Sequence, residues 1–139
     1  MGTAKTMWME HTELKRHVEA IASDIHNGLE QAYCDHCDEF HEGDFREDDT
    51  PCPNCDELME LRLLGGHDYT QDALDIEYYV ASDKTYLGAR ILVAFGGPNI
   101  WIDTKRGEVE GYWGGETARA SFHDDPMAVA DAISDIFHC

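Results

Sequence analysis

The chain has 139 residues, which is enough for one domain with a hydrophobic core of its own. Its 10 Lys and Arg residues face 29 Asp and Glu residues, so the formal charge is −19 at pH 7. Such a surface repels phosphates, which excludes nucleic acid and anionic membranes as direct partners. The charge favours a basic protein surface as the partner, although proteins adapted to high salt are also acidic and need no such partner.

No apolar run approaches the ~18 residues of a membrane-spanning helix, and residues 1–14 lack the apolar core of a secretory signal. We therefore expect a cytoplasmic protein without a membrane partner. Because cytoplasmic thiols stay reduced, the five cysteines indicate metal ligands or redox groups rather than disulfides.

An N-terminal helix is predicted over residues 6–32. Apolar residues recur there every three or four positions, at Leu14, Val18, Ile21, Ile25 and Leu29. This spacing places them on one helical face, which we expect to pack on the protein's own sheet, with a partner-binding helix as the alternative. Gly28, which follows Asn27, is a point at which the helix can end early.

Short strands and a final helix are predicted for the rest of the chain. The predicted strands lie at 57–64, 75–82, 89–95, 100–102, 109–113 and 117–122. Gly-rich turns between the later strands indicate an antiparallel meander. Two acidic residues before Pro126 favour a helix start, so we expect the last helix over 127–138.

Four cysteines form two CxxC pairs, Cys34 with Cys37 and Cys52 with Cys55, and fourteen residues separate the pairs. Each pair aims two sulfur atoms at one point, as a tetrahedral Zn(Cys)₄ site requires. Because four thiolates leave no open position, we expect one structural Zn²⁺ per chain and no metal catalysis. The segment between the pairs has little apolar content, so metal binding has to supply the free energy that orders it.

Other uses of these cysteines remain alternatives. An iron–sulfur or iron(Cys)₄ centre also uses four thiolates, a redox CxxC needs a preceding strand where we predict a helix, and two disulfides need an oxidising compartment. His36, His41 or His67 can replace one cysteine as a ligand. Cys139 lies outside the two pairs and is expected to be a free thiol.

Acidic residues crowd the same segment: ten lie from Asp35 to Glu57, against Arg46 alone. A rigid anionic array of this kind can imitate the phosphates of DNA and bind a basic groove, and a solvated charge run is the alternative. The predicted partner contacts are Asp44, Glu47, Asp48 and Asp49 in this segment, or Glu108 and Glu110 on one strand face.

Signatures of catalysis are missing from the sequence. It has no Gly-rich loop followed by Lys and Ser or Thr, and His123, which precedes two aspartates, has no activated nucleophile beside it. We therefore expect that the protein is not an enzyme. An enzyme whose site forms in an oligomer is the alternative.

Two motifs in residues 88–122 follow an apolar strand: Gly-Gly-Pro-Asn-Ile-Trp at 96–101 and Val-Glu-Gly-Tyr-Trp-Gly at 109–114. They resemble a segment of small phage and prophage proteins. As a small, acidic, cysteine-rich chain, the protein is also similar in type to the anti-CRISPR proteins that inhibit Cas9 of type II-A systems. The resemblance implies action in a bacterial host cell, where binding to a basic surface of Cas9 would hinder DNA loading. A zinc-containing structural or adaptor phage protein without a CRISPR role is the alternative.

The predicted fold class is α+β, with an N-terminal helix, a zinc-ribbon-like module of four cysteines, an antiparallel β-sheet meander and a C-terminal helix. The helix is expected at 1–32, the module at 33–64, and the sheet with the C-terminal helix at 65–139. We expect the sheet to pack with the N-terminal helix as one domain.

Overall fold

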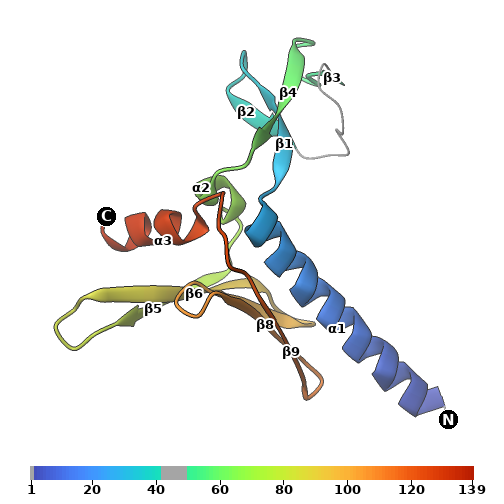
Figure 1. Ribbon diagram of the computed structural model, residues 1–139. Coiled ribbons are helices and arrows are strands. Elements are labelled where there is room, and N and C mark those ends of the chain that lie inside the picture. The colour runs from blue at the N-terminus through green and yellow to red at the C-terminus, as the bar shows by residue number, and fades with distance from the viewer. Residues whose placement is uncertain (1, 42–49) are drawn as a thin grey trace.

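A computed structural model describes the backbone of residues 2–41 and 50–139, and the side chains of residues 13–41 and 50–139. The elements in chain order are α1 (Gly2–Asn27), β1 (Glu30–Cys34), β2 (Glu39–His41), β3 (Thr50–Pro51), β4 (Leu58–Leu63), α2 (Gly66–Tyr69), β5 (Asp75–Val80), β6 (Tyr86–Ala94), β7 (Asn99–Asp103), β8 (Glu108–Trp113), β9 (Glu116–Ser121) and α3 (Val129–Phe137). The predicted α+β class is confirmed, since the chain combines these helices with two antiparallel sheets and a cysteine cluster (Figure 1).

The larger sheet is the predicted meander, with strand order β5-β6-β7-β8-β9. Its register places Ile76, Ile91, Ile102 and Val109 in one row across four strands. Helix α1 packs on β8 and β9, and α3 packs on β6, so both helices cover the face that carries this apolar row. We call this sheet with its helices the body.

Helix α1 ends earlier than predicted, at Asn27 instead of residue 32. Gly28 has a φ of +83°, which glycine adopts without steric cost, and its N–H donates to the carbonyl of Asp24 at 2.8 Å. The expected stripe does form the core side of the helix, because Leu14, Val18 and Ile25 are fully buried. The helical prediction for residues 30–32 is wrong, since they belong to β1.

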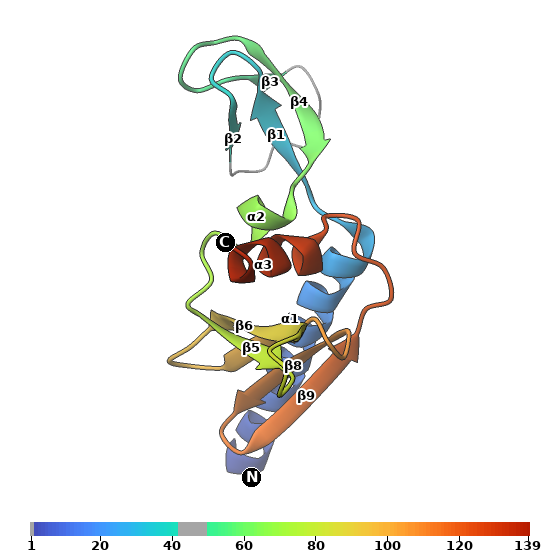
Figure 2. The same ribbon diagram turned by 90° about the vertical axis from the view of Figure 1, so that its left-hand side faces the viewer.

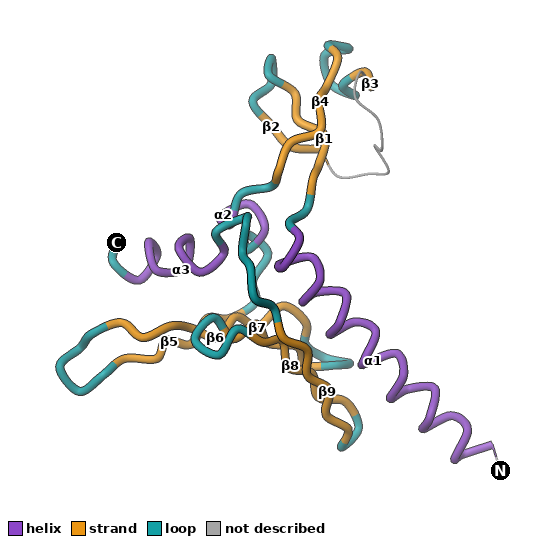
Figure 3. Tube along the Cα trace, viewed as in Figure 1, coloured by secondary structure: helices purple, strands orange, loops and turns teal. Residues whose placement is uncertain are grey.

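The smaller sheet, with strand order β2-β1-β4-β3, is built from residues 30–63 and is called the ribbon below. It stands away from the body in two views and, over its described residues, consists of strands and loops (Figures 2 and 3). Two adjacent connections join it to the body, and the N–H of Leu64 in one donates to the carbonyl of Leu29 in the other at 2.7 Å. In its described part the ribbon therefore meets the body at one end, where Phe40 of β2 also packs against the main core, and it depends on its own contacts elsewhere.

Helix α3 starts at Val129, two residues later than predicted. The Asp125 carboxylate accepts hydrogen bonds from the N–H groups of Val129 at 2.9 Å and Ala130 at 3.0 Å, which caps the helix. Ala128 lies between Asp125 and the helix in the left-handed conformation and so breaks the helical path from Pro126.

None of the helices in the described part of the chain is long and apolar enough to cross a membrane.

Close packing of α1 on β8 depends on Gly111. A Cβ atom at this position would lie 2.6 Å from Val18 Cγ2 and 2.8 Å from Leu14 Cδ1, and both side chains are fully buried. We predict that Gly111→Ala lowers the free energy of unfolding by about 2 kcal/mol in urea denaturation, because the core has no room for the methyl group. Gly97→Ala is the matched control, since nothing lies within 4 Å of its Cβ position; an equal loss in both variants would contradict this packing.

Tyr69, at the end of α2, makes the stability of the protein depend on pH in the alkaline range. Burial, assisted by the nearby Asp24 carboxylate, raises the pKa of Tyr69 from 10.0 to about 12. A raised pKa in the folded protein favours the neutral phenol, so this stabilisation is complete below pH 10 and is lost between about pH 10 and 12. The unfolding free energy of the natural protein should therefore fall relative to that of Tyr69→Phe over this range. A difference in unfolding free energy between the natural protein and Tyr69→Phe that stays constant from about pH 9 to 12 would contradict this pH dependence.

Candidate metal centre

The structure brings the four predicted cysteines of the ribbon together. Cys34 ends β1, Cys37 lies in the following turn, Cys52 follows β3 and Cys55 lies in the turn before β4. Their Sγ atoms all lie within 4.8 Å of one another, with Cys34 and Cys52 fully buried and the other two half-buried. This cluster can hold a metal ion.

Two similar turns aim these sulfur atoms at one point. Each CxxC pair is followed directly by an aspartate in the left-handed conformation, Asp38 with a φ of 53° and Asp56 with a φ of 62°. In the first turn the N–H of Cys37 donates to the Sγ of Cys34 at 3.4 Å, and in the second the N–H of Asp56 donates to the carbonyl of Cys52 at 2.9 Å. The aspartates tolerate this conformation better than most residues do, so the local sequence favours both turns.

The sulfur spacing fits a metal centre better than disulfides. All four cysteines are free, and Cys34 Sγ lies 3.5 Å from Cys55 Sγ, well beyond the ~2.05 Å of a disulfide bond. A tetrahedral ion with metal–sulfur bonds of ~2.3 Å separates its ligand atoms by about 3.8 Å. The four thiols are therefore spaced much as the ligands of such an ion are.

The charge of the cluster also favours a metal ion, because four thiolates this close to one another need a cation among them. Hydrogen bonding to Cys55, with burial as the next cause, raises the pKa of Cys37 to about 12. Burial alone would also raise the pKa of Cys52, but hydrogen bonds from the N–H groups of Asn54 and Cys55 outweigh it and lower that pKa to about 6. A divalent cation among the four sulfur atoms would favour the thiolate form of all of them.

His41 is a further polar contact of this cluster. His41 lies on β2, and its Nε2 lies 3.4 Å from the Sγ of Cys52. Of the three histidines considered as replacement ligands, His67 lies on α2 beside Asp135 at 3.5 Å, and His36 is exposed. With four cysteines already in place, His41 is suited to donate a hydrogen bond to a ligating sulfur, a role that the sequence did not indicate.

Apart from these cysteines, the described residues of the ribbon contribute almost no core of their own. Its buried cluster contains Ala32, Cys34, Cys52 and Met59, with Cys37, Cys55 and Leu61 packed against it. Four of these seven residues are the candidate ligands. A sheet of this size is not stable on so little apolar burial, so a bound metal would supply the missing free energy.

The described surface of the ribbon is acidic. Seven carboxylates are exposed on it, at Glu30, Asp35, Asp38, Glu39, Asp56, Glu57 and Glu60. Arg62 is the only Lys or Arg among the described ribbon residues, and it already pairs with Asp35 at 2.8 Å and with Glu60. Asp44, Glu47, Asp48 and Asp49, the predicted partner contacts of this segment, lie outside the described residues.

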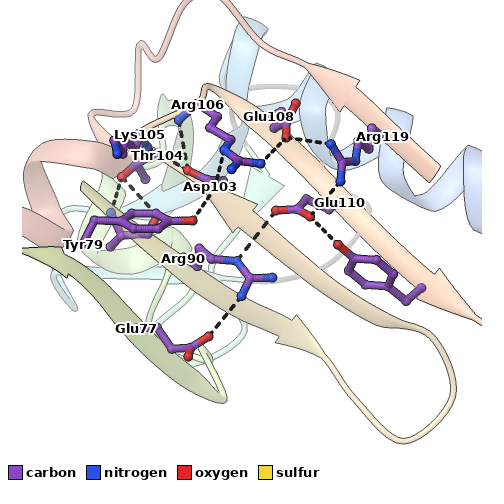
Figure 4. Close-up of polar contacts among 12 residues, drawn as sticks. Glu77, Tyr79, Arg90, Asp103, Thr104, Lys105, Arg106, Glu108, Glu110 and Arg119 are labelled. Atoms are coloured by element: carbon purple, nitrogen blue, oxygen red, sulfur yellow. Dashed lines mark hydrogen bonds and ion pairs between the residues drawn. The ribbon is translucent and has the colours of Figure 1, made fainter. Parts of the chain in front are cut away.

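Glu108 and Glu110, the other predicted contacts, share one face of β8 but are not simply exposed. Glu110 is 4% exposed, lies 3.7 Å from Arg90 Nε and 3.8 Å from Arg119 Nη2, and accepts a hydrogen bond from Tyr112 (Figure 4). Glu108 lies 3.7 Å from Arg119 Nη1 and is 19% exposed. The sequence pattern predicts an open acidic pair, whereas Glu110 is buried beside arginines from β6 and β9.

The same face of the sheet contains a fully buried carboxylate. Asp103 accepts hydrogen bonds from the Tyr79 hydroxyl at 2.8 Å and from the N–H groups of Lys105 and Arg106 at 3.0 Å each (Figure 4). This face therefore uses four of the ten basic residues of the chain, Arg90, Lys105, Arg106 and Arg119. The ribbon acids have no comparable set of partners among the described residues.

His123 and its two neighbours, considered as a catalytic group, have structural partners instead. The Nδ1 atom of His26 accepts hydrogen bonds from the N–H groups of His123 at 3.1 Å and Asp124 at 3.2 Å. Asp125 caps α3. These contacts join α1 to the segment before α3.

Comparisons with known proteins give no assignment for this chain. No protein-family model matches it, and neither the curated proteins nor the solved structures contain a match.

Proposed function

We propose that the protein is a non-catalytic binding protein in which one structural zinc ion keeps the ribbon folded for contact with a basic protein surface. The observation that carries the proposal is the cluster of four free thiols that forms most of the ribbon core. Zinc suits a closed set of four thiolates, has no redox chemistry and needs no further ligand. Cys34, Cys37, Cys52 and Cys55 would hold it.

The charge distribution supports a basic partner. The formal charge of the chain is −19, and the ribbon presents exposed carboxylates with Arg62 alone opposing them in its described part. Zinc with four thiolates adds a further net charge of about −2. Such a potential attracts a basic groove and speeds association with it, and both effects weaken with salt.

The narrower form of the proposal names Cas9 as that partner, with the bound protein hindering DNA loading in a bacterial host cell. It rests on the resemblance of residues 88–122 to a segment of phage proteins and on the similarity of the small, acidic, cysteine-rich chain to anti-CRISPR proteins. The test is a Cas9 cleavage assay in which the zinc-loaded protein is added before or after the target DNA. We expect inhibition when it is added first, and less inhibition at higher salt.

A charge-reversal variant locates the contact. Changing Asp44, Glu47, Asp48 and Asp49 to Lys should relieve inhibition, whereas reversal of Glu13 and Glu19 on the exposed side of α1 should not. Full cleavage in the presence of excess protein would remove Cas9 from the proposal and favour a structural or adaptor role. Inhibition that is unchanged by the charge reversal in the ribbon would contradict the proposal that the ribbon contacts the partner.

A further inference from the structure

A groove lies where the ribbon meets the body. It has a volume of about 750 Å³ and runs between β1 and β2 on one side and α2 with its following turn on the other. The two views show these strands rising above α2 (Figures 1 and 2). The groove is thus formed by two parts of the chain that are joined at Leu29 and Leu64.

Apolar and aromatic side chains form part of the groove lining. Leu64 is 5% exposed, and Leu29, Phe40 and Tyr69 are partly buried against the main core. The Tyr33 ring packs against Phe40 with centroids 5.0 Å apart. These surfaces fit the aliphatic part of a side chain.

Four carboxylates lie among these side chains, Asp38 and Glu39 from the ribbon and Asp68 and Asp72 from the body, and all four are exposed. No Lys or Arg is among the described residues that line the groove. Glu39, Asp68 and Asp72 make no ion pair with any other described residue, in contrast to the acids of the sheet face in Figure 4. The groove therefore combines apolar surface with negative charge that the described chain does not neutralise.

We propose that this groove binds a peptide segment of a partner protein in which Arg or Lys alternates with apolar residues. An arginine has an aliphatic stem for the apolar lining and a guanidinium for the carboxylates and ring faces. The chain shows this pairing within itself, since the Cζ of Arg62 lies 4.2 Å from the centroid of the Tyr33 ring. A segment without Arg or Lys lacks the positive charge that matches the carboxylates, and a segment without apolar residues lacks the surface that matches the apolar lining.

This inference deepens the proposed function and rests on it, because one wall of the groove belongs to the ribbon that the metal would stabilise. Removing the metal should therefore abolish peptide binding even though Asp68 and Asp72 lie outside the ribbon. Zinc content and peptide binding are measured separately, so the two proposals can fail separately.

The test uses the full zinc-loaded chain and fluorescently labelled peptides in an anisotropy titration. We expect a peptide of alternating arginine and leucine to bind, and peptides with glutamate in place of arginine, or glycine in place of leucine, to bind at least about tenfold more weakly. Asp68→Asn combined with Asp72→Asn should weaken binding by about tenfold. Glu13→Gln with Glu19→Gln is the matched control; it changes the net charge equally on the exposed side of α1 and should change affinity by less than about twofold.

Several results would contradict the proposal that this groove binds a peptide. Equal losses in the two double variants would mean that the net charge alone attracts the peptide. Equal affinity for the arginine–glycine peptide would exclude a role for the apolar lining. If a chain with full zinc content binds no peptide, the groove is not a peptide-binding site, but the zinc proposal still holds. If the chain self-associates and binds no peptide, the groove binds a second copy of the chain instead. Glu39→Gln with Asp72→Asn gives an independent variant if the first double variant folds poorly.

Discussion

Cys34→Ser is expected to unfold the ribbon while the body stays folded. The substitution removes one of the four sulfur atoms that lie within 4.8 Å of one another, in a cluster that is most of the ribbon core. Structural zinc supplies on the order of 10 kcal/mol to small modules, far more than this core can replace. Hydrogen exchange should show loss of protection at β1 and β4, with protection at β6 to β8 retained.

Cys139→Ser is the matched control for this variant. Cys139 is exposed and is not part of the cysteine cluster, so its replacement should leave zinc content and ribbon protection unchanged. Cys52→Ser should behave as Cys34→Ser does, because both residues are fully buried. A Cys34→Ser protein that keeps ribbon protection at the natural level would contradict a structural role for the metal.

Asp103→Ala should cause the largest loss of stability in the body, about 4 kcal/mol in urea denaturation. The variant leaves the Tyr79 hydroxyl and the N–H groups of Lys105 and Arg106 without their acceptor at a fully buried position. Tyr79 provides a second measurement, since burial and its hydrogen bond to Asp103 raise its pKa to about 12. An absorbance titration of the variant should show Tyr79 ionising at a lower pH.

The control for Asp103 is Asp83→Ala in the turn between β5 and β6. Asp83 is exposed and accepts a hydrogen bond from the Thr85 N–H at 3.0 Å, so its loss should cost much less stability than the loss of Asp103. Similar losses for the two variants would show that burial of Asp103 adds nothing to the contact. An unchanged Tyr79 titration in Asp103→Ala would exclude the hydrogen bond as a cause of the raised pKa.

Local patterns predicted much of this fold. The apolar stripe from Leu14 to Ile25 identified α1, and the Gly-rich turns identified the strand order of the meander. The end of α1 was predicted too late, because Leu29 continues the helical spacing after Gly28 has already turned the chain. Strand β1 was missed, since its residues form a strand by pairing with β2 and β4, which lie further along the chain.

The cysteine cluster was predictable because each CxxC pair is local and brings two ligands with it. The environment of Glu110 was not, since Arg90 and Arg119 approach it from β6 and β9 and depend on the strand register. The groove also joins residues that are distant in sequence, such as Phe40 and Asp72. Charge composition predicted a basic partner but gave no indication of where on the surface apolar and acidic side chains would meet.

X-ray absorption at the zinc edge, on protein purified under reducing conditions, is the most direct test of the metal centre. We predict one zinc ion per chain with four sulfur neighbours at ~2.3 Å and no nitrogen or oxygen ligand. Chains that contain no zinc, or zinc with fewer than four sulfur ligands, would contradict a closed centre formed by Cys34, Cys37, Cys52 and Cys55.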